Sequence, residues 1–318
     1  MKLIVHYDKP ELVLDVLRQR HPEAAITCCT DYKSLPEMLD RTQPEVLFSI
    51  RFAGTPGFPR TEILGAGSLQ WVSIGGSGTD HLAPWDTGRL MVTNAAGVAA
   101  DVMAQYVIGG VLHFALGFGD FAAHQRNRTW VSGSVSSVRG KTMAILGLGK
   151  TGQAVAKLAK AIGMEVVGIR ARPAATAGVD RVEPVERLHD VLSVADCVTV
   201  CLPLTQATRG LMGTAAFQAM KPGAVFVDVS RGGIVRQADL IEALESGRIK
   251  GAVLDVFEKE PLPADNPLWG MENVIITPHC SSVYDGWDRR AMEMFCDNLD
   301  RWRLGTPLEN VVDPGKGY

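Results

Sequence analysis

Short apolar runs alternate with amphipathic segments along almost the whole chain. A first series predicts five β-strands: Lys2–Tyr7, Ala25–Cys29, Val46–Ile50, Gln70–Ile74 and Met91–Thr93. A second series predicts six more: Thr142–Leu146, Glu165–Ile169, Cys197–Cys201, Ala224–Val229, Gly251–Val256 and Asn273–Ile276. Strands that are apolar throughout, rather than at every second residue, are buried on both faces. The pattern therefore predicts two parallel sheets, each covered by helices.

The segments between the strands predict helices. The clearest are Glu11–Arg20 and Asp288–Arg303, the second of which follows the last strand and can return to the first sheet. The longest apolar stretch, Val102–Phe118, contains Gln105 and His113 and is too short and too polar for a membrane span, so we expect a buried helix.

The boundary between the two sheets falls near Gly97, without a charged or low-complexity linker. We therefore predict an α/β protein with two doubly wound parallel-sheet domains. One comprises residues 1–97 and 283–318, and the other comprises residues 98–282.

Composition narrows the class of protein. The 318 residues are 46% hydrophobic and carry a formal net charge of -3, which gives no general attraction for nucleic acid or an anionic membrane. The N-terminus, Met1–Asp8, has too short an apolar run for a signal peptide, so we expect a cytoplasmic protein. The six cysteines form no CxxC pair, which favours reduced, inert thiols over a metal site.

A dinucleotide motif follows the first strand of the second series. Gly147, Leu148, Gly149, Lys150, Thr151 and Gly152 form a GxGxxG turn between an apolar strand and an amphipathic helix. Glycines there allow a tight turn, close approach of the backbone to a pyrophosphate, and packing of the helix on the strand. The N-terminus of the helix offers free N–H groups to the phosphates.

Polar residues follow several of the predicted strands at their carboxyl ends. The segments are Ile74–Asp80, Asp228–Gly233, Asp255–Pro261 and Thr277–His279. One arginine, one glutamate and one histidine from these segments could meet in space, and such a set is suited to reducing a 2-oxo acid. That reaction needs a cation for the carboxylate, a proton donor for the forming alkoxide, and an anion that keeps the donor protonated.

The ordered set of motifs resembles the D-isomer-specific 2-hydroxyacid dehydrogenases, and among them the glyoxylate/hydroxypyruvate reductases. The motifs are the glycine turn, Pro203-Leu-Thr, Ser230-Arg-Gly-Gly, Asp255-Val-Phe-x-x-Glu-Pro-Leu-Pro, Asn266-Pro-Leu-Trp, Thr277-Pro-His and Pro307-Leu-x-Asn-Val-Val-Asp-Pro. The resemblance covers nearly the whole chain and is weakest before Val46. It implies a flavodoxin-like substrate domain split by an inserted Rossmann cofactor domain. It also implies a homodimer formed through the helix after Gly97 and the arm that holds Trp130.

Carried over residue by residue, the resemblance assigns three catalytic roles. His279 would protonate the carbonyl oxygen, Glu260 would pair with its imidazole, and Arg231 would bind the substrate carboxylate. Substrate would also contact the backbone of Gly76, Ser77 and Gly78. Apart from the resemblance, Arg51 is a further candidate for a substrate contact, because it stands at the end of an apolar strand near Gly54 and Gly57. Leu202, Pro203 and Thr208 would line the cofactor, and Asp255 would hold its carboxamide.

Arg170 and Arg172 stand where an NAD enzyme usually carries an acidic residue for the ribose 2′-hydroxyl. Guanidinium groups suit a 2′-phosphate, so we expect NADP(H). The predicted function is an NADP(H)-dependent reductase that converts small 2-oxo acids, glyoxylate or hydroxypyruvate, to D-2-hydroxy acids. Alternatives are a dinucleotide-sensing, corepressor-like binding protein and an NAD-dependent dehydrogenase of another D-2-hydroxy acid.

The same residues also have structural interpretations. His279 could be a hydrogen-bonded structural histidine, and Arg231 could form a structural ion pair with Glu260. Gly75–Gly78 could be only a turn, and Arg51 could be solvated.

Overall fold

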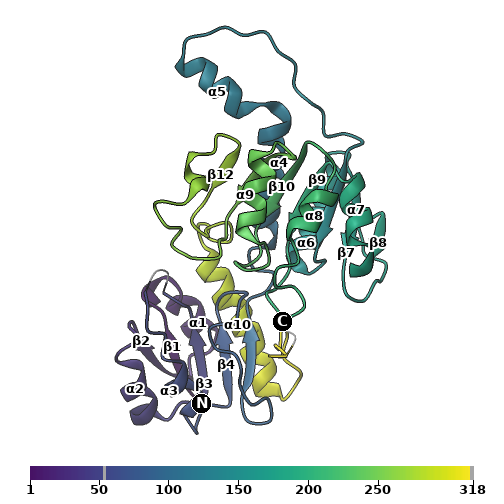
Figure 1. The fold of residues 1–318 in the computed structure, drawn as a ribbon. Coiled ribbons are helices and arrows are strands. Elements are labelled where there is room, and N and C mark those ends of the chain that lie inside the picture. The colour runs from purple at the N-terminus through teal and green to yellow at the C-terminus, as the bar shows by residue number, and fades with distance from the viewer. Residues whose placement is uncertain (53–54, 316–318) are drawn as a thin grey trace. The chain divides into compact units, whose positions relative to one another are not determined.

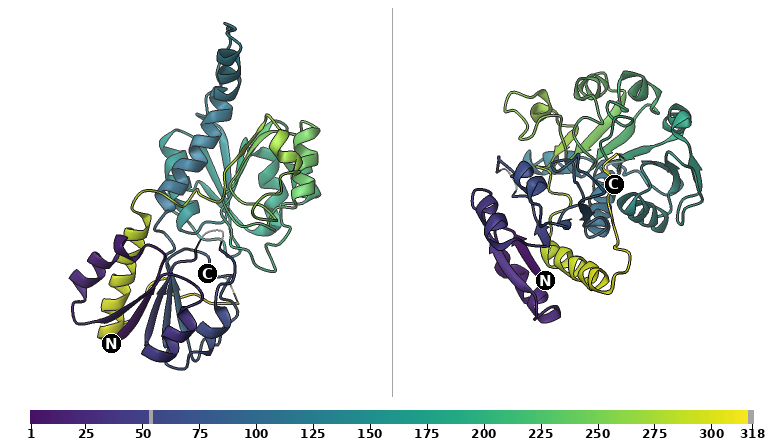
Figure 2. Two further views of the ribbon diagram at one scale, coloured as in Figure 1. Left: turned by 90° about the vertical axis from the view of Figure 1, so that its left-hand side faces the viewer. Right: turned by 90° about the horizontal axis from the view of Figure 1, so that it is seen from below.

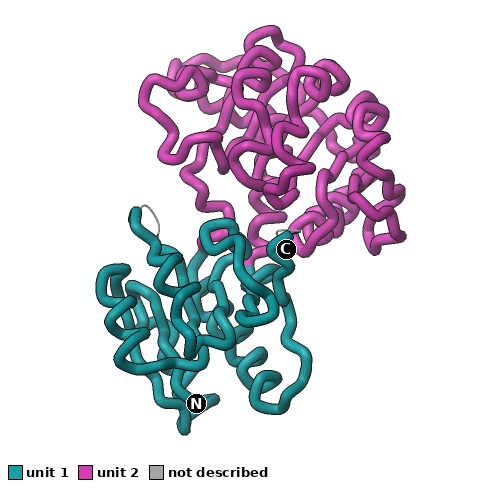
Figure 3. Tube along the Cα trace, turned by 60° about the horizontal axis from the view of Figure 1, so that its bottom comes forward, with its two compact units in different colours: residues 1–98, 284–318 teal, residues 99–283 magenta. Residues whose placement is uncertain are grey.

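The computed structural model describes residues 1–52 and 55–315; Figure 1 labels most of the elements, and Figure 2 shows them from two further sides. The chain divides into two compact units (Figure 3). Unit 1 is Met1–Val98 with Tyr284–Tyr318, and unit 2 is Ala99–Val283.

Within its described residues, unit 1 has a five-stranded parallel sheet in the order β2-β1-β3-β4-β5. The strands are β1 (Lys2–His6), β2 (Ala25–Cys29), β3 (Val46–Ser49), β4 (Trp71–Ile74) and β5 (Met91–Asn94). One face packs against α1 (Leu14–Arg20) and α10 (Trp287–Leu304), and the other against α2 (Leu35–Thr42) and α3 (Arg60–Gly65). Successive strand residues alternate between the two faces, as Leu3 and Ile4 do. The strand order is that of the flavodoxin-like fold.

The described part of unit 2 has a seven-stranded parallel sheet in the order β12-β11-β10-β9-β6-β7-β8. The strands are β6 (Thr142–Leu146), β7 (Glu165–Ile169), β8 (Arg181–Glu183), β9 (Cys197–Val200), β10 (Ala224–Asp228), β11 (Ile249–Leu254) and β12 (Val274–Ile276). The chain starts in the middle at β6, builds outwards to β8, then returns to β9 beside β6. This order is that of a doubly wound dinucleotide fold.

The helices of unit 2 cover both faces of this second sheet, except for α5, which stands away from it. Their bounds are α4 (Ala100–Leu116), α5 (Phe118–Arg126), α6 (Lys150–Ala161), α7 (Leu188–Val194), α8 (Thr214–Ala219) and α9 (Gln237–Glu245), with short 3-10 turns at Val185–Arg187 and Pro267–Gly270. α4 and α6 pack on one face with Met143 and Ile145, while α7, α8 and α9 pack on the other with Ala144 and Leu146. Both faces of each inner strand are therefore buried, as the continuous apolar runs predict.

Two predicted elements differ from the structure. The helix predicted over Glu11–Arg20 is a 3-10 turn (Pro10–Leu12) followed by α1, because fully buried Val13 (φ -127°, ψ -19°) interrupts the helical backbone to reach the core. The edge strand β8 was not predicted, since Val182 is the one apolar residue in its three positions.

By length and composition, none of the helices in the described ranges could cross a membrane alone. The bent pair α4 and α5, with 61° between them, passes that test only when both helices are taken together. α4 is buried along one side against the sheet, whereas α5 and the chain after it stand away from the sheet of unit 2 (Figures 1 and 2).

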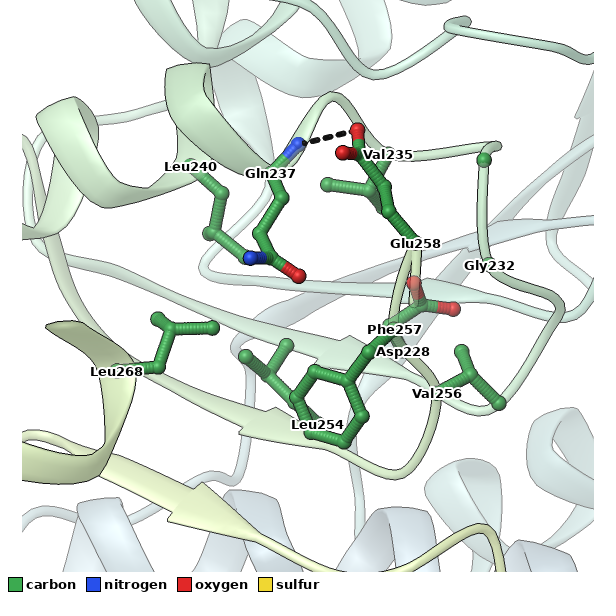
Figure 4. A pocket seen from close by; sticks show the side chains of 11 residues that line it. Asp228, Gly232, Val235, Gln237, Leu240, Leu254, Val256, Phe257, Glu258 and Leu268 are labelled. Atoms are coloured by element: carbon green, nitrogen blue, oxygen red, sulfur yellow. Dashed lines mark hydrogen bonds between the residues drawn. The ribbon is translucent and has the colours of Figure 1, made fainter. Parts of the chain in front are cut away.

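A buried carboxyl closes β10 and supports the turn that follows it. Asp228 is 3% exposed and accepts hydrogen bonds from the N–H (3.0 Å) and the hydroxyl of Ser230. It lines a small pocket with the apolar side chains of Leu254, Val256 and Leu268 (Figure 4). Burial raises the pKa of Asp228 to about 7, although the bonds from Ser230 oppose this.

This pKa predicts a pH dependence of stability. Between pH values of about 4 and 7 the unfolded chain has released the Asp228 proton and the folded chain retains it, so stability falls as pH rises. We expect Asp228→Asn to remove this fall, so that the stability of the variant relative to wild type increases from pH 5 to pH 8. Urea unfolding at pH 5 and at pH 8 measures the two stabilities, with Asp265→Asn, a change at an exposed residue, as control. An equal difference from wild type at both pH values would contradict the assignment.

Candidate active site

The glycine turn after β6 has the geometry that a dinucleotide site requires. Gly147 adopts φ +99°, and a Cβ there would lie 2.8 Å from the carbonyl oxygen of Cys201. A Cβ on Gly152 would lie 1.9 Å from the carbonyl oxygen of Gly147, so α6 packs on the turn without a side chain between them. Gly149, in contrast, has nothing within 4 Å of its Cβ position. The turn is thus closed toward the protein and open toward a ligand.

The start of α6 is available to an anion. Gly149 is its N-cap and has no side chain to cap the helix, so among the described residues no side chain caps its first N–H groups. The turn lies between β6 and β9, where the strand order reverses and where doubly wound sheets bind their ligands. The residues present therefore fit the pyrophosphate of a nicotinamide dinucleotide.

The flanking residues predicted to contact the cofactor divide into two kinds. Leu148 is 4% exposed and packs against Gly168, so its backbone rather than its side chain is available to a ligand. Lys150 is exposed and Thr151 is half-buried, with its hydroxyl 3.7 Å from the sulfur of Met103.

The segment after β9 borders the same turn. Leu202 approaches Gly147, with its Cδ2 3.1 Å from the Cβ position of that glycine. The hydroxyl of Thr208 donates to the carbonyl of Pro203 at 2.7 Å and accepts the N–H of Thr205 at 2.8 Å. Thr208 therefore shapes this segment through its own hydrogen bonds.

Two arginines follow β7. Arg170 is half-buried and Arg172 is exposed, and within the described ranges no hydrogen bond or ion pair engages either guanidinium group. The edge strand β8 brings a carboxylate beside this strand end, since Glu183 pairs in register with Ile169. That carboxylate already forms an ion pair with Arg181 at 3.0 Å. The end of β7 is therefore rich in positive charge.

His279 and Glu260 form the hydrogen-bonded pair expected from their motifs. His279 Nδ1 lies 2.8 Å from Glu260 Oε2, and Glu260 Oε1 accepts the backbone N–H of Phe257 at 3.0 Å. Both side chains are partly open to solvent, at 39% and 36% exposure. Because Nδ1 is engaged, Nε2 is the ring nitrogen left to exchange a proton with a substrate.

The surroundings of Glu260 keep it ionised. Burial raises the pKa of Glu260, but hydrogen bonds from His279 and Phe257, together with the charges of His279 and Arg231, outweigh it and hold the pKa below its usual value.

Arg231 lies on a turn held closely against the segment that carries Glu260. A Cβ on Gly232 would lie 1.9 Å from the carbonyl oxygen of Phe257, so the two backbones touch. Arg231 Nη1 donates to the carbonyl of Ser230 at 2.7 Å. The structure therefore brings Arg231, Glu260 and His279 to one end of the unit 2 sheet, and Glu260 pairs with the histidine.

Asp255 has partners that the sequence did not indicate. It is 1% exposed, and it accepts bonds from the Thr277 hydroxyl (2.6 Å) and from the N–H groups of Cys280 (2.8 Å) and Ser281 (3.0 Å). All three donors belong to the loop that carries His279. The expected contact with a carboxamide stays a prediction, whereas the bonds to this loop are present in the structure.

In unit 1, the Gly76–Gly78 segment follows β4. Its carbonyl groups are engaged, because Gly76 accepts the N–H of Ala95 (2.9 Å) and Ser77 accepts the side-chain amide of Asn94 (2.7 Å). Among the described residues, no acceptor is bonded to the N–H groups of residues 76–78. A segment with several unbonded N–H groups is better suited to bind a carboxylate than a turn whose N–H groups are already bonded.

Arg51 follows the neighbouring strand, β3, and is exposed. Within the described chain its guanidinium forms no hydrogen bond or ion pair. The preceding interpretations of Arg51, as a substrate ligand or as a solvated side chain, therefore both stay open.

Comparisons with known proteins identify the family. Residues 108–281 match the model of the D-isomer specific 2-hydroxyacid dehydrogenase, NAD binding domain. A D-3-phosphoglycerate dehydrogenase from Methanocaldococcus jannaschii is 32% identical over 87% of this chain and 53% of its own length. A glyoxylate/hydroxypyruvate reductase B from Enterobacter sp. is 39% identical over 56% of this chain and 55% of its own. The chain thus spans about half the length of these relatives.

A solved structure extends the similarity to the whole chain. The D-isomer specific 2-hydroxyacid dehydrogenase from Xanthobacter autotrophicus Py2, in complex with NADPH and MES, has a TM-score of 0.85 and 32% identity. The similarity covers 99% of each chain. With its two parallel-sheet units and the family match over more than half its length, this chain belongs to the D-isomer-specific 2-hydroxyacid dehydrogenase family.

Proposed function

We propose that the protein is an NADP(H)-dependent reductase that converts small 2-oxo acids, glyoxylate and hydroxypyruvate first among them, to D-2-hydroxy acids. The observation that carries the proposal is the His279–Glu260 pair, joined at 2.8 Å. It lies at the same sheet end as the Arg231 turn and the glycine turn after β6.

The cofactor would supply a hydride to the carbonyl carbon of the substrate. His279 Nε2 would give its proton to the carbonyl oxygen, so that the hydride and the proton together form the hydroxy acid. Glu260, whose pKa is held below its usual value, would be ionised. It would stabilise the imidazolium before the proton is transferred and fix the ring through Nδ1. In the reverse direction the neutral ring would accept the proton.

Two groups would recognise the substrate. The guanidinium of Arg231 can bind a carboxylate and the adjacent carbonyl oxygen as a planar fork, which lysine cannot reproduce. In unit 1, the N–H groups of residues 76–78 are also suited to a carboxylate. Arg231 would bind a single acid group, so a small monocarboxylate should be preferred. Oxaloacetate should be poor because its second carboxylate would lose hydration without a partner.

The choice of NADP(H) rests on charge. Arg170 and Arg172 follow β7, and no described residue forms a hydrogen bond or ion pair with either guanidinium group, while Glu183 is engaged by Arg181. A 2′-phosphate would meet two cations there, whereas a 2′-hydroxyl would lack its usual acidic partner. The NADPH complex of the X. autotrophicus relative supports the same choice.

A homodimer is part of the proposal. α5 and the following arm carry large apolar side chains in solvent: Phe118 (56% exposed), Phe121 (40%), Trp130 (97%), Val131 (46%) and Val135 (56%). A projecting apolar surface of this kind is typical of an interface. The cytoplasmic location expected from the sequence stays a prediction.

Replacing the proposed acid tests its role. We expect His279→Ala to lower kcat for glyoxylate about 10²-fold or more, the range for general acid catalysis, with unchanged binding of NADPH. The control is His189→Ala, because His189 is exposed on α7. Steady-state kinetics and NADPH titration by fluorescence measure the two quantities. An undiminished kcat would show that another group supplies the proton.

Charge reversal after β7 tests the cofactor. Wild type should have the higher kcat/KM with NADPH, and Arg170→Asp should shift the preference toward NADH, because a carboxylate repels the 2′-phosphate and can bond a 2′-hydroxyl. Lys33→Asp, an equal change of charge at an exposed residue of unit 1, should leave the ratio of the two cofactors unchanged. Better use of NADH by wild type would refute the choice of NADP(H).

A further inference from the structure

The backbone of His279 has an unfavourable conformation that contacts with other residues must stabilise. Its φ is +52°, in the left-handed region that residues other than glycine rarely adopt. Such conformations persist only where the surrounding contacts fix them. The bond between Glu260 and the ring orients the side chain, but it leaves the backbone of residues 277–281 to be fixed by other groups.

A buried carboxylate fixes that backbone on both sides of His279. Asp255 accepts the Thr277 hydroxyl before it and the N–H groups of Cys280 and Ser281 after it, at 2.6, 2.8 and 3.0 Å. Asp255 itself follows β11, an inner strand paired with β10 and β12. Its backbone N–H is also bonded to the carbonyl of Asp228 at 3.0 Å, so the acceptor has a rigid base.

The hydrogen bonds extend one residue further, to a helix. The hydroxyl of Tyr106 on α4 lies 2.6 Å from Thr277 Oγ1. Thr277 gives its single hydroxyl proton to Asp255, so the bond with Tyr106 must be donated by the tyrosine. Burial raises the pKa of Tyr106 to about 12, so its proton is present throughout the working pH range.

α4, which carries Tyr106, is held in place by close packing against the sheet. Its Val107 and Val111 are buried in the core cluster that α4 shares with α6 and the sheet. Gly110 lies so close to β11 that a Cβ there would be 2.7 Å from Val253 Cγ2. Tyr106 therefore projects from a helix that is packed directly against the strand leading to Asp255.

We propose that Tyr106 and Thr277 are positioning residues for His279. The chain from the Tyr106 hydroxyl through the Thr277 hydroxyl to Asp255 holds the loop in the strained conformation that places the imidazole beside Glu260. This proposal rests on the proposed function insofar as His279 is the proton donor. The two hydroxyls act on the geometry of the loop, so their loss should lower kcat and leave binding of substrate and NADPH unchanged.

Three variants and one control test the proposal by kinetics. Thr277→Val keeps the shape of the side chain and removes the hydroxyl that joins Tyr106 to Asp255. We expect kcat for glyoxylate to fall about tenfold or more, because His279 would no longer be held in position. Tyr106→Phe should cause a smaller loss, because Thr277 still reaches Asp255. Thr277→Ser restores the hydroxyl and should restore kcat. Thr199→Val removes a fully buried hydroxyl from β9, outside this chain of bonds, and should leave kcat unchanged.

A double variant separates positioning from general damage. In a His279→Ala background, Thr277→Val should cause no further loss of kcat, because the group it positions is already absent. An equal loss in both backgrounds, a wild-type kcat for Thr277→Val, or a failure of Thr277→Ser to restore kcat would each overturn the proposal.

Amide hydrogen exchange tests the same bonds without any turnover. The N–H groups of Cys280 and Ser281 should exchange faster in Thr277→Val than in wild type or Thr277→Ser, since the loop loses one of its three attachments to Asp255. Unchanged exchange would refute the positioning role even if glyoxylate proved not to be a substrate. Failure of wild type to reduce any 2-oxo acid, with the exchange result as expected, would refute the proposed function alone.

Discussion

Parallel pairing of every strand is the constraint on which the site depends. A parallel sheet buried on both faces places the carboxyl ends of all its strands along one edge. In unit 2 this edge collects the glycine turn after β6, Arg231 after β10, Asp255 after β11 and Thr277 after β12. These residues are far apart in the sequence. Their proximity follows from strand direction and order, before any side-chain contact is considered.

Three carboxyl groups at or near this edge differ because their surroundings differ. Asp228 lies among apolar side chains, and burial raises its pKa to about 7. Glu260 is bonded to His279 and Phe257 and lies in the field of Arg231, which keeps its pKa below its usual value. Asp255 accepts three hydrogen bonds from a single loop. Asp228 supports a turn, Glu260 orients the imidazole of His279, and Asp255 fixes the backbone that carries this imidazole.

Much of the fold follows from local sequence patterns. Buried parallel strands are apolar at every position, so the inner strands could be predicted to within a residue or two, as β6 and β7 were without error. β8 was not predicted, because an edge strand needs little apolar surface. The break in the helix at Val13 was not predicted either, because it depends on the core against which Val13 packs.

The candidate site was predictable only in part. Motifs identify His279, Glu260 and Arg231 as chemically suited residues, and the structure places them at one sheet end, but their roles stay predictions. The bonds from Tyr106 to Thr277 and from Thr277 to Asp255 join residues 171 and 22 positions apart, so no local pattern could indicate them. Leu148 fits the motif, yet packing against Gly168 buries its side chain.

The central claim is that His279 protonates the carbonyl oxygen of a 2-oxo acid while hydride reaches one fixed face of the carbonyl carbon. Chiral analysis of the glycerate formed from hydroxypyruvate and NADPH tests this claim most directly, because the face of the carbonyl carbon that receives the hydride sets the configuration of the product. The account predicts D-glycerate as the product. Formation of L-glycerate, or of a mixture of both isomers, would contradict it.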